Sequence, residues 1–255
     1  MARRLPPLAL AYHSVEARPL REDPFGLCTS PRRLERQIRR LRAWGYELVT
    51  FGELAHRVRD GDASGAAALT FDDGFADNLH ALVPLLRAHR ARATVFAVTG
   101  WLGERHPQRP HSAILTADEL RALAAHGVEI GSHSVTHPDL CALGYDEALA
   151  ELATSRHELE AVLDAAVGVV AYPYGKASAA TLAACAAAGY RAGCRVSGNG
   201  TWDDPFNMPR QDMDNGATLL GLRLKRDDRY EPLVRTAAGR LSLWTIRSAR
   251  RWAGQ

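Results

Sequence analysis

The chain has 255 residues, of which 46% are hydrophobic and 24% are charged, and these values are ordinary for a soluble globular protein. Its formal net charge is only +3, and its basic residues are scattered without an aromatic-interleaved stripe, so nucleic-acid binding has little support. No apolar run approaches the roughly 20 residues of a membrane-spanning helix, so we expect no transmembrane segment.

The start of the chain does not resemble a targeting segment. Arg3 and Arg4 form a basic flank, but the apolar stretch that follows is short and is broken by Pro6 and Pro7. A secretory signal has a longer apolar region, so we expect a cytoplasmic location. Residues 1–255 can bury a sizeable core, and α/β barrels of this length commonly form one domain, so we expect a single domain.

The predicted secondary structure alternates between apolar strands and amphipathic helices. Strands are expected where short runs are rich in apolar residues, and helices where apolar residues recur every three or four positions. In chain order, the sequence predicts a strand at 8–12, a helix at 31–44, a strand at 46–50, a helix at 51–59, a strand at 66–71, a helix at 79–86, a strand at 93–98, a helix at 117–126, a strand at 128–131, a helix at 145–166, a strand at 167–172, a helix at 179–188, a strand at 190–196 and an extended segment at 208–213. This alternation predicts a parallel sheet covered by helices, and leaves open whether the sheet closes.

Two segments carry less regular signals. Asp77 or Asn78 is expected to cap the helix at 79–86, in which Pro84 marks either a kink or the real first turn. Residues 99–112 are polar and show no clear periodicity. We therefore predict that they form a loop.

Two adjacent acids end the strand at 66–71. Asp72 and Asp73 precede Gly74, so both carboxylates are expected at the carboxyl end of the strand, where α/β folds place their chemistry. Adjacent carboxylates cannot both be buried without a cation or a shared proton, because like charges a few ångströms apart raise one pKa strongly. A metal ion would resolve the conflict. Taken alone, the pair is more often a solvated turn.

Two histidines follow the strand at 128–131. His133 and His137 are four residues apart, and imidazoles at this spacing can reach one metal ion. Pro138 disfavours a helix at His137, so we place the pair on a turn after the strand. Such a pair alone is more often two surface histidines. Together with a strand-end aspartate, however, it would leave a coordination position open for water, as a catalytic metal site requires.

At these residues the sequence resembles the polysaccharide deacetylases of carbohydrate esterase family 4. The resemblance is carried by Thr70-Phe-Asp-Asp-Gly74, by His133-Ser-Val-Thr-His137 and by Ala171-Tyr-Pro-Tyr-Gly175, and it extends to Ala11-Tyr-His-Ser-Val15 and Met208-Pro-Arg210. It implies a distorted (β/α) barrel of about seven strands with the active site at the carboxyl rim. Independently of it, one set of chemically active residues falls at the carboxyl ends of predicted strands: His13, Asp72, Asp73, His133, His137 and Tyr174.

The resemblance implies hydrolysis of an acetamide on an amino sugar. Asp73, His133 and His137 would hold a divalent metal ion, and Asp72 would be the general base. The expected metal is zinc, although two imidazoles and a carboxylate also accept cobalt, nickel or iron. Bound zinc lowers the pKa of water to about 7. The expected partner is an N-acetylated amino sugar of a glycan or a glycan precursor, and the sequence indicates no oligomeric state.

The remaining roles follow from departures from the family pattern. The family's usual acid is a histidine near the carboxyl end, but none follows His157 here. The chain is instead similar to a subset with an amino-terminal Tyr-His pair, which assigns the acid to His13. Ala171 replaces the arginine that orients the base, and Arg210 is the candidate substitute.

Three further residues have expected roles near the reacting groups. Tyr174 is expected to offer its backbone N–H to the oxyanion and its ring to the sugar. Asp203 and Asp204 are possible partners of His13, although a solvated loop is the commoner interpretation of both.

Two other functions remain open at this stage. The same metal chemistry would serve a hydrolase of a non-sugar amide, formamide or cyclic imide. A catalytically decayed glycan-binding protein is favoured slightly by the altered third motif and the missing histidine. It is disfavoured by the intact Asp-Asp pair, because a binding module needs no base beside a metal ion.

The cysteines and the end of the chain complete the predictions. Cys28, Cys141, Cys185 and Cys194 lack tight zinc spacing, and we expect reduced, buried thiols. Residues 240–255 mix leucine, isoleucine and tryptophan with arginine. They are predicted to form a closing helix packed on the body, with contact between a basic amphipathic helix and an anionic membrane surface as the alternative.

Overall fold

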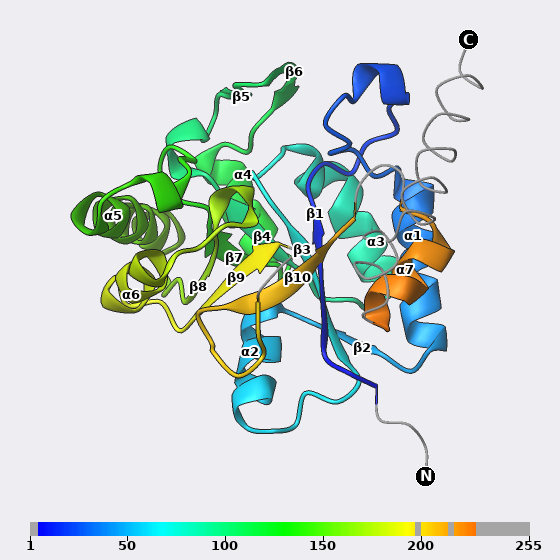
Figure 1. The fold of residues 1–255 in the computed structure, drawn as a ribbon. Helices are drawn as coiled ribbons and strands as arrows, with labels where there is room; N and C mark the ends of the chain where they lie inside the picture. The colour runs from blue at the N-terminus through cyan, green and yellow to red at the C-terminus, as the bar shows by residue number, and fades with distance from the viewer. Residues whose placement is uncertain (1–4, 197–199, 214–216, 228–255) are drawn as a thin grey trace, which may run out of the picture.

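The computed structural model describes residues 5–196, 200–213 and 217–227. Within these ranges the chain forms a sheet of parallel strands with helices around it (Figure 1). The strands of this sheet are β1 (Leu8–Tyr12), β2 (Glu47–Val49), β3 (Ala66–Phe71), β4 (Thr94–Ala97), β7 (Glu129–Ser132), β8 (Val169–Ala171), β9 (Ala192–Val196) and β10 (Met208–Asp212). All eight lie within segments that the sequence predicted to be extended or differ from them by one residue at an end.

The sheet closes because β1 pairs along both of its edges. Leu10 lies opposite Gln211 of β10 on one edge and opposite Leu69 of β3 on the other. Among the described strands, the ring runs β1, β10, β9, β8, β7, β4, β3 and back to β1, and β2 pairs with β3 outside it. The predicted α/β barrel of about seven strands is therefore confirmed.

Strand β3 explains why the barrel is distorted. One of its edges is occupied by β1 along most of its length. Strand β2 pairs with residues 66–68 and strand β4 with residues 70–71, so these two neighbours share the other edge. Strand β3 therefore reaches β4 only through its last two residues, at the end that bears Asp72 and Asp73.

Alternating side chains divide the core into an inner and an outer part. Ala9, Ala68 and Ala171 belong to a cluster with Phe96 and with Phe51 of helix α2 (Phe51–Arg59), which lies at the lower end of the barrel in Figure 1. A second and larger cluster joins the other strand faces to the surrounding helices. Because side chains alternate along a strand, the inward row of β3 continues from Ala68 through residue 70 to residue 72.

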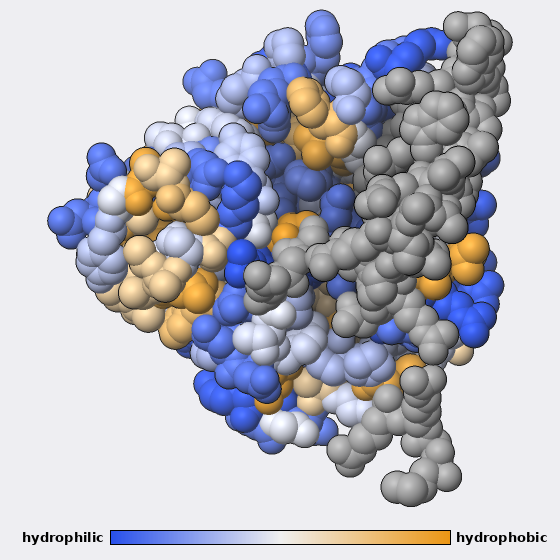
Figure 2. All heavy atoms as spheres, in the orientation of Figure 1, coloured by the Kyte–Doolittle hydropathy of each residue, from blue (hydrophilic) through white to orange (hydrophobic). Residues whose placement is uncertain are grey.

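The helices that follow the strands flank the barrel. In Figure 1, α5 and α6 lie on one side of it and α1, α3 and α7 on the other. Besides α2, the described helices are α1 (Pro31–Ala43), α3 (Val83–Ala88), α4 (Ala117–Ala125), α5 (Tyr145–Leu163), α6 (Ala179–Ala187) and α7 (Leu219–Arg226). The hydrophobic spheres over α5 and α6 in Figure 2 include exposed alanines of α6, an ordinary consequence of its alanine-rich sequence.

Two local predictions were wrong in informative ways. The predicted loop at 99–112 contains an antiparallel hairpin of β5 (Arg105–His106) and β6 (Arg109–Ala113). The side chain of Asp77 does not cap a helix, because its carboxylate accepts hydrogen bonds from Ser14 Oγ at 2.6 Å and from Val15 N at 2.8 Å. The helix at this place begins instead with a π-helical turn, η2 (Asn78–Leu82), and Pro84 lies in the first turn of α3.

The cysteines are free thiols, as predicted, and three of them are buried. Cys141 is exposed, contrary to expectation, because it lies in the short turn η4 (Leu140–Ala142) ahead of α5. In the part of the chain that the structure describes, every helix is too short or too polar to cross a bilayer. The predictions for residues 240–255, both the closing helix and the membrane contact, lie outside the described residues, and the single-domain prediction stays a prediction.

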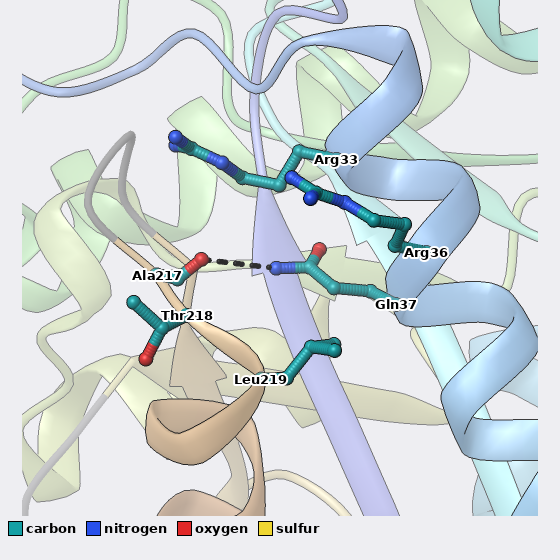
Figure 3. Close-up of a pocket in the computed structure, with 6 residues that line it drawn as sticks. All are labelled: Arg33, Arg36, Gln37, Ala217, Thr218 and Leu219. Carbon is teal, nitrogen blue, oxygen red and sulfur yellow. Dashed lines mark hydrogen bonds between the residues drawn. The ribbon is translucent and has the colours of Figure 1, made fainter.

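A cavity of about 240 Å³ lies between α1 and the start of α7. Its lining residues are Arg33, Arg36, Gln37, Ala217, Thr218 and Leu219 (Figure 3). Gln37 extends into this cavity from α1 (Figure 3). Its side-chain amide donates to Ala217 O at 3.4 Å and accepts from the buried Tyr12 hydroxyl at 3.0 Å. This cavity contains none of the strand-end acids and histidines, and the Gln37 bonds tie α1 to β1 and to the segment before α7.

Candidate metal centre

The two acids after β3 are both buried and point to different partners. Asp72 is 3% exposed and Asp73 is 4% exposed. Asp73 has φ = 70°, in the left-handed region that aspartate tolerates better than most residues, and Gly74 follows with φ = 75°. This turn separates the two carboxylates: Asp72 meets Arg210, and Asp73 meets His133 and His137. The conflict between adjacent buried carboxylates is thereby relieved in part by a guanidinium group.

Asp73, His133 and His137 form a three-ligand cluster. The carboxylate Oδ1 of Asp73 lies 3.7 Å from Nε2 of His133 and 3.7 Å from Nε2 of His137. One ligand atom from each residue lies within 4.8 Å of the others. Zinc ligands about 2.1 Å from a tetrahedral ion lie about 3.4 Å from one another. The spacing and the donor atoms therefore fit one divalent cation.

The loop that carries the two histidines is held by hydrogen bonds. His133 Nδ1 donates to Ala171 O at 2.7 Å, which leaves the Nε2 lone pair free to face Asp73. Glu151 of α5 accepts from the backbone N–H groups of Val135 at 2.9 Å and Thr136 at 3.0 Å. Glu151 was not singled out from the sequence, because a glutamate inside a long helix carries no signal of its loop contacts.

Left-handed backbone conformations gather at this site. The non-glycine residues with positive φ in the described ranges include Asp73, Ser134, His137 and Tyr174, with φ between 58° and 70°. Each such residue costs on the order of 1–3 kcal/mol, and such strain is concentrated at functional sites. Pro138 does keep His137 out of a helix, as predicted, and His137 takes φ = 61°.

The protonation states suit cation binding. Burial lowers the pKa of His137 to about 4, and the neighbouring His133 acts in the same direction, so the imidazole is neutral at pH 7 and its nitrogen can bind a metal ion. Burial acts to raise the pKa of Asp73, but a hydrogen bond from His106 and the nearby histidine rings outweigh it, and the net pKa is lowered. Asp73 is therefore an anionic ligand at neutral pH.

Asp72 and Arg210 form a bidentate ion pair inside the barrel. Arg210 Nη1 lies 2.6 Å from Asp72 Oδ1, and Nη2 lies 2.8 Å from Oδ2. Nη1 also donates to Thr70 Oγ1 at 2.8 Å, and Arg210 is completely buried. Burial acts to raise the pKa of Asp72, but the charge of Arg210, followed by that of His133, lowers it overall. The guanidinium of Arg210 thus binds the carboxylate of Asp72, a contact that the methyl side chain of Ala171 cannot make.

His13 follows β1 and is half-buried near both acids. The proximity of His13 is among the causes that lower the pKa values of Asp72 and Asp73. Asn78 Nδ2 donates to His13 O at 3.1 Å, and Asp77 holds the next two residues of the turn. The segment after β3 therefore sets the position of the segment after β1.

Asp203 and Asp204 make their hydrogen bonds within their own loop. Asp203 Oδ2 accepts from Thr201 Oγ1 at 3.3 Å, and Asp204 Oδ1 accepts from Phe206 N at 2.9 Å. These contacts fit the loop interpretation of both residues.

Aromatic side chains border the cluster. Tyr174 lies in the short turn η5 (Pro173–Gly175), is 55% exposed, and has its ring centroid 4.8 Å from that of His137. Trp101 has its centroid 5.1 Å from that of His137 and 5.0 Å from that of His106. Sequence reasoning missed Trp101 and His106, because both fall in the segment taken as a polar loop. Their one available signal was their position after the strand at 93–98.

Comparison with known proteins shows which family this chain is similar to. The family described as polysaccharide deacetylase matches residues 60–193, which are 134 of the 255 residues. YxkH of Bacillus subtilis (strain 168), whose name places it among polysaccharide deacetylases, is 27% identical over 186 residues, which are 72% of this chain and 62% of YxkH. A chitooligosaccharide deacetylase of Sinorhizobium fredii (strain NBRC 101917 / NGR234) is 30% identical over 139 residues, which are 52% of this chain and 58% of that protein.

These alignments span less than two thirds of the length of either relative. Among solved structures, the Streptococcus pyogenes deacetylase PplD has a TM-score of 0.73 at 23% identity, over 87% of this chain and 98% of PplD. That likeness shows the shared fold. Since the family match covers more than half of the chain and includes Asp72 as well as the three residues of the cluster, this chain belongs to the polysaccharide deacetylase family.

Proposed function

We propose that the protein is a metal-dependent N-deacetylase that removes an acetyl group from an amino sugar of a glycan or glycan precursor. One observation carries the proposal: an ionised, buried aspartate, Asp72, lies directly beside a second aspartate that shares a cation-sized cluster with two histidines. If the Arg210–Asp72 ion pair had only a structural role, it would not require a neighbouring cluster of Asp73, His133 and His137. Membership of the deacetylase family supports the choice of an N-acetylated sugar.

The proposed metal ligands are Asp73, His133 and His137. A divalent cation held there would polarise the acetamide carbonyl and lower the pKa of a water molecule. Zinc is the expected ion, and cobalt, nickel and iron suit the same donor atoms. The lowered pKa of His137 and the ionised Asp73 support this assignment, because both groups then offer lone pairs at neutral pH.

Asp72 is the proposed general base. With both oxygens bound to Arg210, the carboxylate is held in one orientation and kept ionised, so that it can accept a proton from the attacking water. Arg210 is accordingly the proposed orienting group, in the role left vacant by Ala171. The proposed oxyanion donor is the backbone N–H of Tyr174, and the exposed ring of Tyr174 is proposed to contact the sugar.

His13 is the proposed general acid for the leaving amine. Replacing it by glutamine is expected to lower kcat by about 10²–10⁴-fold with little change in KM, because an amine leaves poorly without a proton. The measurement is steady-state kinetics on an N-acetylated sugar and on 4-nitrophenyl acetate. The nitrophenolate leaves without protonation, so the ester should lose far less rate.

The matched control for His13→Gln is His80→Gln, since His80 is an exposed histidine with a side-chain exposure of 69%. It should retain wild-type rates on both substrates. An equal loss on the amide and the ester in His13→Gln would contradict the acid role.

The proposed activity is tested by incubating the purified protein with a panel of substrates and measuring released acetate. The panel contains N-acetylated mono- and oligosaccharides, N-formylated sugars and cyclic imides. We expect acetate from the N-acetylated sugars, and a loss of on the order of 10²-fold or more after chelation, because a site without its cation no longer polarises the carbonyl. Zinc, cobalt, nickel or iron should restore the rate.

The other outcomes of the panel separate the alternatives. Turnover of formamides or imides in place of acetamides would reassign the substrate class while keeping the metal chemistry. A protein that contains no metal and turns over none of the panel would contradict the proposed function, and sugar binding without turnover would point to a glycan-binding role.

A further inference from the structure

His106 brings a third imidazole to the proposed metal site from outside the barrel. It lies at the end of β5, in the hairpin between β4 and α4, and is 3% exposed. Its ring stacks on Phe75, with centroids 5.1 Å apart and an interplanar angle of 7°, and meets the edge of Trp101 at 5.0 Å. One face of the imidazole thus packs on Phe75, and Trp101 gives the ring a second aromatic contact.

The hydrogen bonds of His106 fix its tautomer. The backbone N–H of Gln108 donates to His106 Nδ1 at 3.1 Å, so Nδ1 is an acceptor without a proton. In the neutral ring the proton then resides on Nε2. That atom lies 3.4 Å from Oδ2 of Asp73, while Oδ1 of the same carboxylate faces His133 and His137. Each oxygen of Asp73 therefore has a separate set of partners.

We infer that His106 is a positioning residue that holds Oδ2 of Asp73 away from the cation, so that Asp73 binds it through Oδ1 alone. A carboxylate free to rotate can present both oxygens and occupy two coordination positions. A carboxylate held through Oδ2 occupies one, which leaves room for water and substrate beside two imidazoles. This inference rests on the proposed function, because it concerns the same metal site.

Arg109 holds the hairpin in place independently of His106, so the contribution of His106 to the metal site can be tested apart from its contribution to hairpin packing. Arg109 is 6% exposed, and its Nη2 donates to Cys28 Sγ at 2.8 Å. Its guanidinium lies 5.6 Å from the centroid of the Phe75 ring, and Nη1 lies 3.8 Å from Asp23 Oδ1. These contacts tie the hairpin to the segment after β1 without using the Nε2 proton of His106.

The test uses His106→Phe, which keeps a ring on Phe75 but removes the donor, and His106→Gln, whose amide can replace that donor. The measurement is the zinc dissociation constant by competition with a chelating dye, together with the thermal midpoint of the metal-free protein. We expect His106→Phe to weaken zinc binding by about 10–100-fold. The metal-free midpoint should stay near the wild-type value, and His106→Gln should recover most of the affinity.

The matched control is His111→Phe, the same substitution at an exposed position of the same hairpin, which should bind zinc as the wild type does. Wild-type zinc affinity in His106→Phe would overturn the inference. So would equal weakening in both His106 variants accompanied by a lowered metal-free midpoint, because that pattern indicates packing alone. A wild-type protein that binds no zinc would overturn the proposed function along with the inference, whereas the first two results leave the proposed function intact.

Discussion

Asp72→Asn is expected to lower the rate of deacetylation by about 10²–10⁴-fold while the protein keeps its metal content. The asparagine side chain has nearly the same shape, but its amide cannot accept a proton from water at neutral pH. The proposed metal ligands are other residues, so the metal occupancy should not change. The measurements are kcat on the best N-acetylated substrate and metal content by elemental analysis.

The companion variant for Asp72→Asn is His133→Ala, which should lose both activity and bound metal. His133 is 2% exposed and supplies one of the three ligand atoms, so its removal acts on the cluster itself. Circular dichroism on each variant verifies that the barrel is intact. Retained activity in Asp72→Asn would remove the basis for calling Asp72 the general base, and lost metal in that variant would place Asp72 among the ligands.

Arg210→Met is expected to lower the free energy of unfolding by about 3–5 kcal/mol at pH 7, because it leaves the carboxylate of Asp72 buried without a partner. For a chain of this length, each kcal/mol changes the melting temperature by about 2–4 °C. The melting temperature should therefore fall by about 6–20 °C. The measurement is the unfolding midpoint by heat and by urea at several pH values.

The loss of unfolding free energy in Arg210→Met should become smaller as the pH is lowered. In the wild type the pKa of Asp72 is lowered, so its stabilising contribution is present above the unfolded-state pKa of about 4 and is lost as the pH falls through the folded-state value. Without Arg210, burial alone should raise that pKa, so the variant is penalised most at neutral pH. The difference in stability between wild type and variant should shrink as the pH is lowered from 7 towards 4.

Arg195→Met is the matched control for the pH dependence. Arg195 donates to Asn207 Oδ1 at 3.0 Å and to Ala177 O at 3.3 Å, and neither acceptor is charged. This variant should lose less stability, and its loss should be the same at pH 4 and pH 7. A similar pH profile for both arginine variants, or a loss under about 1 kcal/mol in Arg210→Met, would show that the Asp72 carboxylate does not depend on Arg210 for its charge.

Much of the fold was predictable because local pattern and burial agree in the strands. The apolar runs at 8–12 and 66–71 are the observed strands β1 and β3 without any shift. Parallel strands present their carboxyl ends at one rim, so Asp72, Asp73, His133 and His137 were predicted to be neighbours before any contact was known. The structure brings these four residues together.

The other features of the fold and the site depend on residues that are distant in the sequence. Arg210 was a candidate partner of Asp72 only through the family resemblance, because their pairing requires the register of β10 against β1 and of β1 against β3, which periodicity does not determine. Asp77 stands where a helix cap is expected, but its carboxylate accepts a hydrogen bond from the hydroxyl of Ser14 instead. His106 was overlooked because a short hairpin with little apolar alternation has the composition of a loop.

The position of β1 between β3 and β10 has a consequence for the order of folding. Residues 8–12 pair on one edge with the segment at 208–212, which is synthesised almost two hundred residues later. Before that segment arrives, the barrel has an open seam, Asp72 lacks its guanidinium partner and the rim is incomplete. The proposed activity should therefore emerge in one late event, and hydrogen exchange along β1 should report the same opening of the barrel that is expected to abolish it.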